Sequence, residues 1–161
     1  MLLLDHIDEM KYYFMIDDNC TYKVPGNSYQ IQFKRKDYNT YYDKANLYMI
    51  ELSIYTNFGT CIETIKLKES TNSWLIHCAD EFLDEPETYN EDKYMCISFD
   101  DISVKDMSLH KIYFKREGDF IKVDIIKGLY RSRVYSYNIV LTFTCTISEF
   151  KSFIYCFAFV S

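Results

Sequence analysis

Histidine and cysteine are the residues of this sequence best suited to metal or nucleophilic chemistry. The histidines are His6, His77 and His110, and there are six cysteines. No C-x-x-C or H-x-x-x-H spacing occurs, and on a helix the adjacent pair His77-Cys78 would point about 100° apart, which is poor geometry for one ion. The four glycines form neither G-x-G-x-x-G nor G-x-x-x-x-G-K. We therefore expect no metal and no cofactor.

His110 is the histidine closest to a group of acids. It follows Asp100, Asp101 and Asp106, and a histidine beside a carboxylate can act as an acid–base pair. This pattern leaves a small hydrolase open as one hypothesis. Acids between two strands are also typical of a simple turn.

The distribution of charge is the most informative feature of the sequence. Seven acids and no base lie between Asp80 and Asp92, whereas the rest of the chain carries 18 bases and 17 acids. The net charge of −6 therefore comes from one segment. Residues 111–133 are basic by comparison, so nucleic-acid contact there stays open although a pI near 5 disfavours it.

A dense negative segment is typical either of a solvated helix end or of a docking surface for a basic partner. Tyrosine favours the second interpretation, because it is common at protein interfaces; it also suits half-exposed strands. The predicted partner-binding residues are Asp80, Glu81, Asp84, Glu85, Glu87, Tyr89, Glu91, Asp92 and Tyr94.

Strands and helices must position these residues. Apolar spacing predicts a helix over 74–82 that leads into the acidic segment, and a capping box at Thr146–Glu149 predicts a closing helix. Alternation predicts strands at 29–33, 47–55, 61–68, 94–99, 109–115, 120–126 and 134–144. Residues 3–15 have helical spacing, although 12–16 fit a strand equally well, and 34–46 have the polar composition of a loop.

The order of these elements predicts one α+β domain over residues 1–161. Consecutive strands joined by short turns pair antiparallel, so we expect a mostly antiparallel β-sheet packed by two or three helices. A half-open barrel is the structural alternative. The sequence shows no internal repeat.

The compartment is predicted from the ends and the cysteines. The start Met1–Asp5 lacks a basic region before its leucines, and the apolar end Phe150–Val160 is too short to cross a bilayer. Six scattered cysteines without a signal peptide indicate reduced thiols in the cytoplasm. If the apolar end is exposed, it favours a homodimer.

The chain resembles the immunity proteins that accompany bacterial polymorphic toxins, including those of contact-dependent growth inhibition. The likeness lies in the helix start Asn72-Ser73-Trp74-Leu75 before the acidic stretch, in the strand residues Lys111–Tyr113 and Gly118–Ile121, and in the closing Ile147–Phe153. It covers about the last 90 residues, and no functional residue transfers by position.

The resemblance implies a cytoplasmic, non-enzymatic protein that binds a cognate toxin domain, often a basic nuclease, and blocks it. The acidic segment with Tyr89 and Tyr94 is then the expected contact surface, with no membrane partner. A phage or mobile-element inhibitor of host defence, acting by protein binding or nucleic-acid mimicry, is the alternative.

Overall fold

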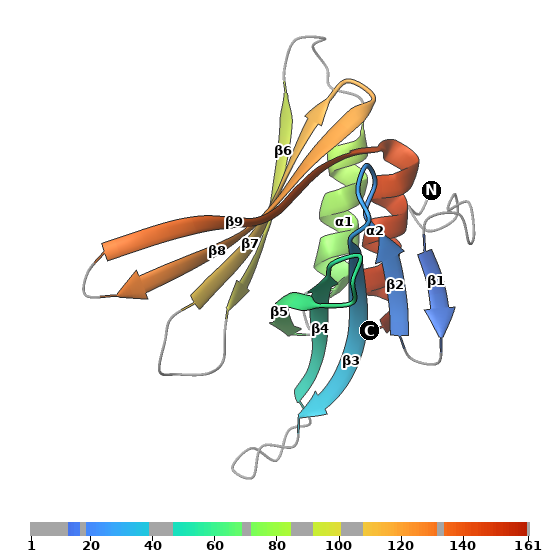
Figure 1. The fold of residues 1–161 in the computed structure, drawn as a ribbon. Coiled ribbons are helices and arrows are strands. Elements are labelled where there is room, and N and C mark those ends of the chain that lie inside the picture. The colour runs from blue at the N-terminus through green and yellow to red at the C-terminus, as the bar shows by residue number, and fades with distance from the viewer. Residues whose placement is uncertain are drawn as a thin grey trace.

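Nine strands and two helices make up the part of the chain that the computed structural model describes, which is residues 13–16, 19–38, 47–68, 72–84, 92–100, 108–131 and 134–160 (Figure 1). The strands are β1 Tyr13–Ile16, β2 Asn19–Lys23, β3 Gln30–Tyr38, β4 Leu47–Tyr55, β5 Cys61–Lys68, β6 Lys93–Asp100, β7 Ser108–Glu117, β8 Phe120–Arg131 and β9 Val134–Thr146. The helices are α1 Asn72–Leu83 and α2 Ile147–Val160. The predicted α+β class is confirmed.

The strands form two antiparallel sheets. Sheet A has the order β1-β2-β3-β4-β5 and sheet B the order β6-β7-β8-β9, so each strand pairs with its neighbours in sequence. The expectation of one sheet was wrong, because β5 does not join the ladder of β6 and α1 separates them in the sequence. Five strands thus precede α1 and four strands precede α2.

Helix α2 supplies the centre of the core. Its Phe153 ring lies 5.1 Å from Tyr22 and 5.6 Å from Phe33 in sheet A. The same ring lies 5.9 Å from Phe114 and 6.2 Å from Phe143 in sheet B. Because these side chains are almost completely buried, one helix joins the inner faces of both sheets.

The polar atoms along α2 are satisfied where they meet sheet A. The Tyr22 hydroxyl donates to the Glu149 carbonyl oxygen over 3.0 Å, as a buried phenol requires. The Cys20 and Cys156 sulfur atoms lie 2.7 Å apart, and both thiols are buried. Residues that are more than a hundred positions apart in the sequence therefore fix the docking of α2.

Helix α1 packs between α2 and the edge of sheet B. Its buried residues are Leu75, Ala79 and Phe82, and the Phe82 ring lies 5.4 Å from Phe150 of α2. The predicted apolar face is confirmed at Leu75 and Phe82, while the Trp74 side chain lies outside the described residues. The helix thereby brings the start of the acidic segment against β6.

The capping box is confirmed in atomic detail. Thr146 N–H donates to Glu149 Oε1 over 2.9 Å, and Glu149 N–H donates to Thr146 Oγ1 over 3.2 Å. These reciprocal bonds satisfy two N–H groups at the start of α2. At its other end Phe157 is fully buried within the chain, so this part of the apolar end does not depend on a second subunit for its burial.

The structure decides one open alternative and corrects the sequence prediction at two other elements. Tyr13–Ile16 is strand β1, so the strand alternative holds there and the helix does not, while 1–12 lie outside the described residues. Residues 34–38 continue β3, because they pair with 47–51 of β4. The rest of the expected loop, 39–46, lies outside the described residues. Strand β2 was missed because it contains only two buried apolar residues, Cys20 and Tyr22.

Candidate functional site

Two cationic side chains of sheet B cap the C-terminal end of α1. The last turn of α1 contains no basic residue. Arg116 of β7 donates through Nη1 to the Leu83 carbonyl over 2.6 Å and to the Asp84 carbonyl over 3.2 Å. Lys93 of β6 donates to the Glu81 carbonyl over 3.2 Å and also to that of Asp84. These cations satisfy carbonyl groups that have no partner within a helix and oppose the negative end of its dipole.

A pocket of about 360 Å³ lies beside this helix end, between α1 and β6. Phe82 and Met95 are its buried apolar residues, while Glu81 and Tyr94 are exposed at it. The remaining lining residues are Cys78, Lys93 and Cys96. The arrangement offers an apolar floor with a carboxylate and a phenol at the opening.

The predicted contact residues gather around this pocket where the structure describes them. Asp80 and Glu81 lie on α1, Asp84 directly follows it, and Asp92 and Tyr94 flank the start of β6. Glu81 and Tyr94 line the same pocket, although they are far apart in the sequence. The predicted residues Glu85, Glu87, Tyr89 and Glu91 lie outside the described residues. We call the exposed set Glu81, Asp84, Asp92 and Tyr94 the α1–β6 edge.

Basic side chains lie beside the carboxylates of the α1–β6 edge. Glu81 Oε1 lies 3.2 Å from His77 Nε2, one helical turn away, and Asp92 Oδ2 lies 3.6 Å from Lys115 Nζ. The Lys115 ammonium also lies 6.0 Å from the Tyr94 ring centre. The hydrogen bond that Lys115 donates to Glu117 and the nearby charge of Asp92 raise the pKa of Lys115, so it is charged at neutral pH. The edge is a mosaic of both signs rather than a uniform acidic patch.

Cys78 at the pocket does not fit nucleophilic chemistry. Burial, and then the negative charge of Glu81, raise the pKa of the Cys78 thiol. A nucleophilic cysteine needs the opposite shift, because the thiolate is the reactive form. Burial also raises the pKa of Cys145 in β9 to about 12.

Sequence reasoning missed part of this site. No pattern in the sequence indicated that Cys78 and Phe82 of α1 would line the same pocket as Met95 and Cys96 of β6. The basic character of residues 111–133 was visible, but only tertiary structure shows that Arg116 caps α1. The only sequence signal for the cap was the absence of a basic residue in the last turn of the helix.

His110 lies elsewhere, between the two sheets. Its Nε2 atom is 3.0 Å from Glu63 Oε1 of β5, and Lys127 Nζ of β8 is 3.3 Å from the same oxygen. The side chain is 5% exposed and lines neither of the two pockets described in this section. The carboxylate beside it is Glu63 and not one of the acids that precede it, whose side chains lie outside the described residues. This cluster connects β5 to β7 and β8.

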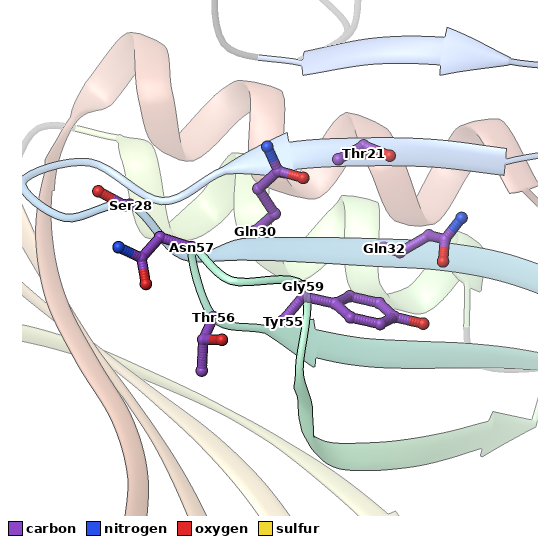
Figure 2. A pocket seen from close by; sticks show the side chains of 8 residues that line it. All are labelled: Thr21, Ser28, Gln30, Gln32, Tyr55, Thr56, Asn57 and Gly59. Atoms are coloured by element: carbon purple, nitrogen blue, oxygen red, sulfur yellow. The ribbon is translucent and has the colours of Figure 1, made fainter.

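A second pocket, of about 480 Å³, lies on the outer face of sheet A. Figure 2 shows its lining side chains, which come from β2, β3, β4 and the turns that follow β2 and β4. They are Thr21, Ser28, Gln30, Gln32, Tyr55, Thr56, Asn57 and Gly59. None of them is charged, and none belongs to the predicted contact set.

Among the described residues, no group of three or more His, Cys, Asp or Glu side chains is placed to hold a metal ion. The helices of the same part of the chain include none that is both long and apolar enough to cross a membrane. Comparison with protein families, with curated proteins and with solved structures gives no match to this chain. The functional argument therefore depends on the residues themselves.

Proposed function

We propose that this chain is a cytoplasmic, non-enzymatic inhibitor of the immunity type, which binds a basic toxin domain through the α1–β6 edge. The observation that supports the proposal most is that Glu81 and Tyr94 line one pocket. Tyr94 is 70% exposed. Tyrosine rings contribute most to binding when a partner covers them, so this exposed ring is available for such a contact.

The pocket has the chemistry to receive an arginine or lysine of the partner. Such a side chain has an apolar stem, which suits the floor of Phe82 and Met95, and a cationic head. The head would reach the Glu81 carboxylate and the face of the Tyr94 ring, two groups that attract cations. A basic nuclease surface is rich in such side chains.

The remaining carboxylates of the α1–β6 edge would attract the positively charged partner before the two proteins touch. Asp84 is exposed at the end of α1, and no basic side chain lies in ion-pair distance of it among the described residues. Exposed charges at the rim of an interface change the association rate more than the lifetime of the complex. The edge would thus attract a positive partner, while the pocket holds it.

The test compares two single charge reversals. The partner is captured from cells that encode the chain, identified by mass spectrometry and purified, and its association rate is measured by stopped-flow fluorescence at low salt. We expect Asp84→Lys to slow association about fivefold or more, an effect that added salt removes. The matched control is Asp119→Lys, an exposed acid in the β7–β8 turn, which should change the rate less than about twofold.

Equal effects of the two substitutions would show that only the net charge matters and would refute a site at the α1–β6 edge. A captured partner that is acidic would refute the proposed electrostatic basis.

A further inference from the structure

The outer face of sheet B, which points away from the core, has an unusual composition. Along β7, Ile112 and Phe114 are buried, so Lys111, Tyr113 and Lys115 point outward. The exposed apolar side chains of this face include Tyr113 at 41%, Phe120 at 54%, Tyr137 at 54% and Ile139 at 67%. Aromatic rings and lysines therefore alternate on one surface.

The strand register shows how these residues lie. Lys115 of β7 is opposite Lys122 of β8, and Tyr113 is opposite Asp124 in the next outward row. Lys111 is opposite Ile126, which pairs in turn with Ile139 of β9. Outward residues on one strand are about 7 Å apart and neighbouring strands about 4.8 Å. The Tyr113 ring thus lies between two lysines along β7 and near a third on β8.

No element covers this face in the described part of the chain. Both helices pack against the inner sides of the sheets, through Phe82, Phe150 and Phe153. The β8–β9 hairpin extends away from them (Figure 1). The high solvent exposure of Phe120 and Ile139 agrees with a face that no described element covers.

Among the described side chains, lysines outnumber carboxylates on this face by three to two, even though the protein is acidic. Lys111, Lys115 and Lys122 point outward together with Glu117 of β7 and Asp124 of β8, and Asp124 accepts a hydrogen bond from Thr142. Lys115 is paired with Glu117 at 3.0 Å and with Asp92 at 3.6 Å, whereas Lys111 and Lys122 make no ion pair within the described part of the chain. Lysine is depleted in the cores of protein–protein interfaces, so lysines among exposed aromatic rings favour an anionic ligand with flat apolar groups.

We propose that the outer face of sheet B binds single-stranded nucleic acid, with bases stacked on its aromatic rings and phosphates held by its lysines. Single strands present both groups, whereas the bases of a duplex are stacked on one another and cannot stack on these rings. Stacking on aromatic side chains tolerates any base, so binding should depend little on sequence.

The experiment uses the full chain and fluorescein-labelled oligo(dT) and oligo(rU) of about 20 nucleotides, with binding followed by fluorescence anisotropy. We expect log affinity to fall against log salt with a slope of about −1.4, because contacts from the two unpaired lysines, Lys111 and Lys122, release counterions. Tyr113→Ala should weaken binding about tenfold through the lost stacking. Lys122→Ala should weaken binding and make the slope shallower by about 0.7.

Matched controls come from the outer face of sheet A. Tyr55→Ala and Lys34→Ala remove the same residue types from a sheet surface of different composition, and each should change affinity less than about twofold. Circular dichroism establishes that every variant is folded. None of the four residues lines the α1–β6 pocket, so this outcome is independent of the proposed toxin binding.

The proposal is overturned if the wild-type chain fails to bind either oligonucleotide at about 50 mM salt, or if Tyr113→Ala and Tyr55→Ala have the same effect. Equal affinity for a duplex of the same length would overturn the stacking geometry. If Tyr113→Ala and Lys122→Ala alter self-association in sedimentation and leave oligonucleotide binding unchanged, the face is a protein interface and the proposal fails.

Discussion

Sheet A and sheet B have similar inner faces and different outer faces. Inside, both are lined by buried aliphatic and aromatic residues such as Ile31 and Phe33 in sheet A or Ile112 and Phe114 in sheet B. Outside, sheet A carries an uncharged row in which Thr21, Gln32, Ser53 and Thr64 are in register. The outer face of sheet B carries lysines and exposed aromatic rings instead.

This difference shows which residues the packing of the fold constrains and which residues it does not. The two inner faces share one core through α2, so packing constrains them in the same way. The outer faces contribute little to packing, and their residues are free to serve binding. Both surfaces for which we propose partners, the α1–β6 edge and the outer face of sheet B, include residues of sheet B.

The largest expected loss of stability comes from a substitution in the core that both sheets share. Phe153→Ala removes a ring that contacts Tyr22 and Phe33 on one side and Phe114 and Phe143 on the other. We expect the free energy of unfolding to fall by about 3–5 kcal/mol, measured by urea denaturation. Both sheets should lose stability in one transition, because they share this residue.

The matched control is Tyr113→Ala, an aromatic residue on the outer face of sheet B that should cost less than about 1 kcal/mol. Two separate transitions in the Phe153→Ala variant, with only one sheet destabilised, would show that the sheets do not share a core.

A smaller effect tests the polar link between the sheets. Glu63→Ala removes the carboxylate that contacts both His110 and Lys127. Because His110 is buried, the loss leaves a polar group without this partner, and we expect a cost of about 1–3 kcal/mol in urea denaturation.

The comparison variant is Glu117→Ala, which breaks a solvent-exposed ion pair with Lys115. Exposed pairs contribute about 0–1 kcal/mol. A cost for Glu63→Ala no larger than that of Glu117→Ala would mean that the cluster does not hold the sheets together.

Local patterns in the sequence predicted most of the fold. The capping box, the alternating strands and the hairpins around Gly59 and Gly118 depend on neighbouring residues, and both glycines have positive φ as their turns require. The division into two sheets and the position of α2 depend on contacts over more than a hundred residues, such as Cys20 with Cys156. No local pattern encodes those contacts.

The candidate site was predictable to a smaller extent. The acidic segment directed attention to Glu81, Asp84, Asp92 and Tyr94, because net charge is a property of the sequence. The pairing of Asp92 with Lys115 and the capping of α1 by Arg116 were not visible, since they depend on β7 passing beside the helix end. The tertiary structure therefore shows that the predicted acidic surface contains charges of both signs beside a pocket with an apolar floor.

The most direct test of the proposed function is site-specific photo-crosslinking in cells that encode the chain. The photoreactive residue p-benzoylphenylalanine replaces Tyr94 in one variant and Phe58, which is 89% exposed in the β4–β5 turn of sheet A, in the other. The account predicts a covalent complex with one basic protein from position 94 and none from position 58. The same complex from both positions, or from position 58 alone, would contradict a partner site at the α1–β6 edge.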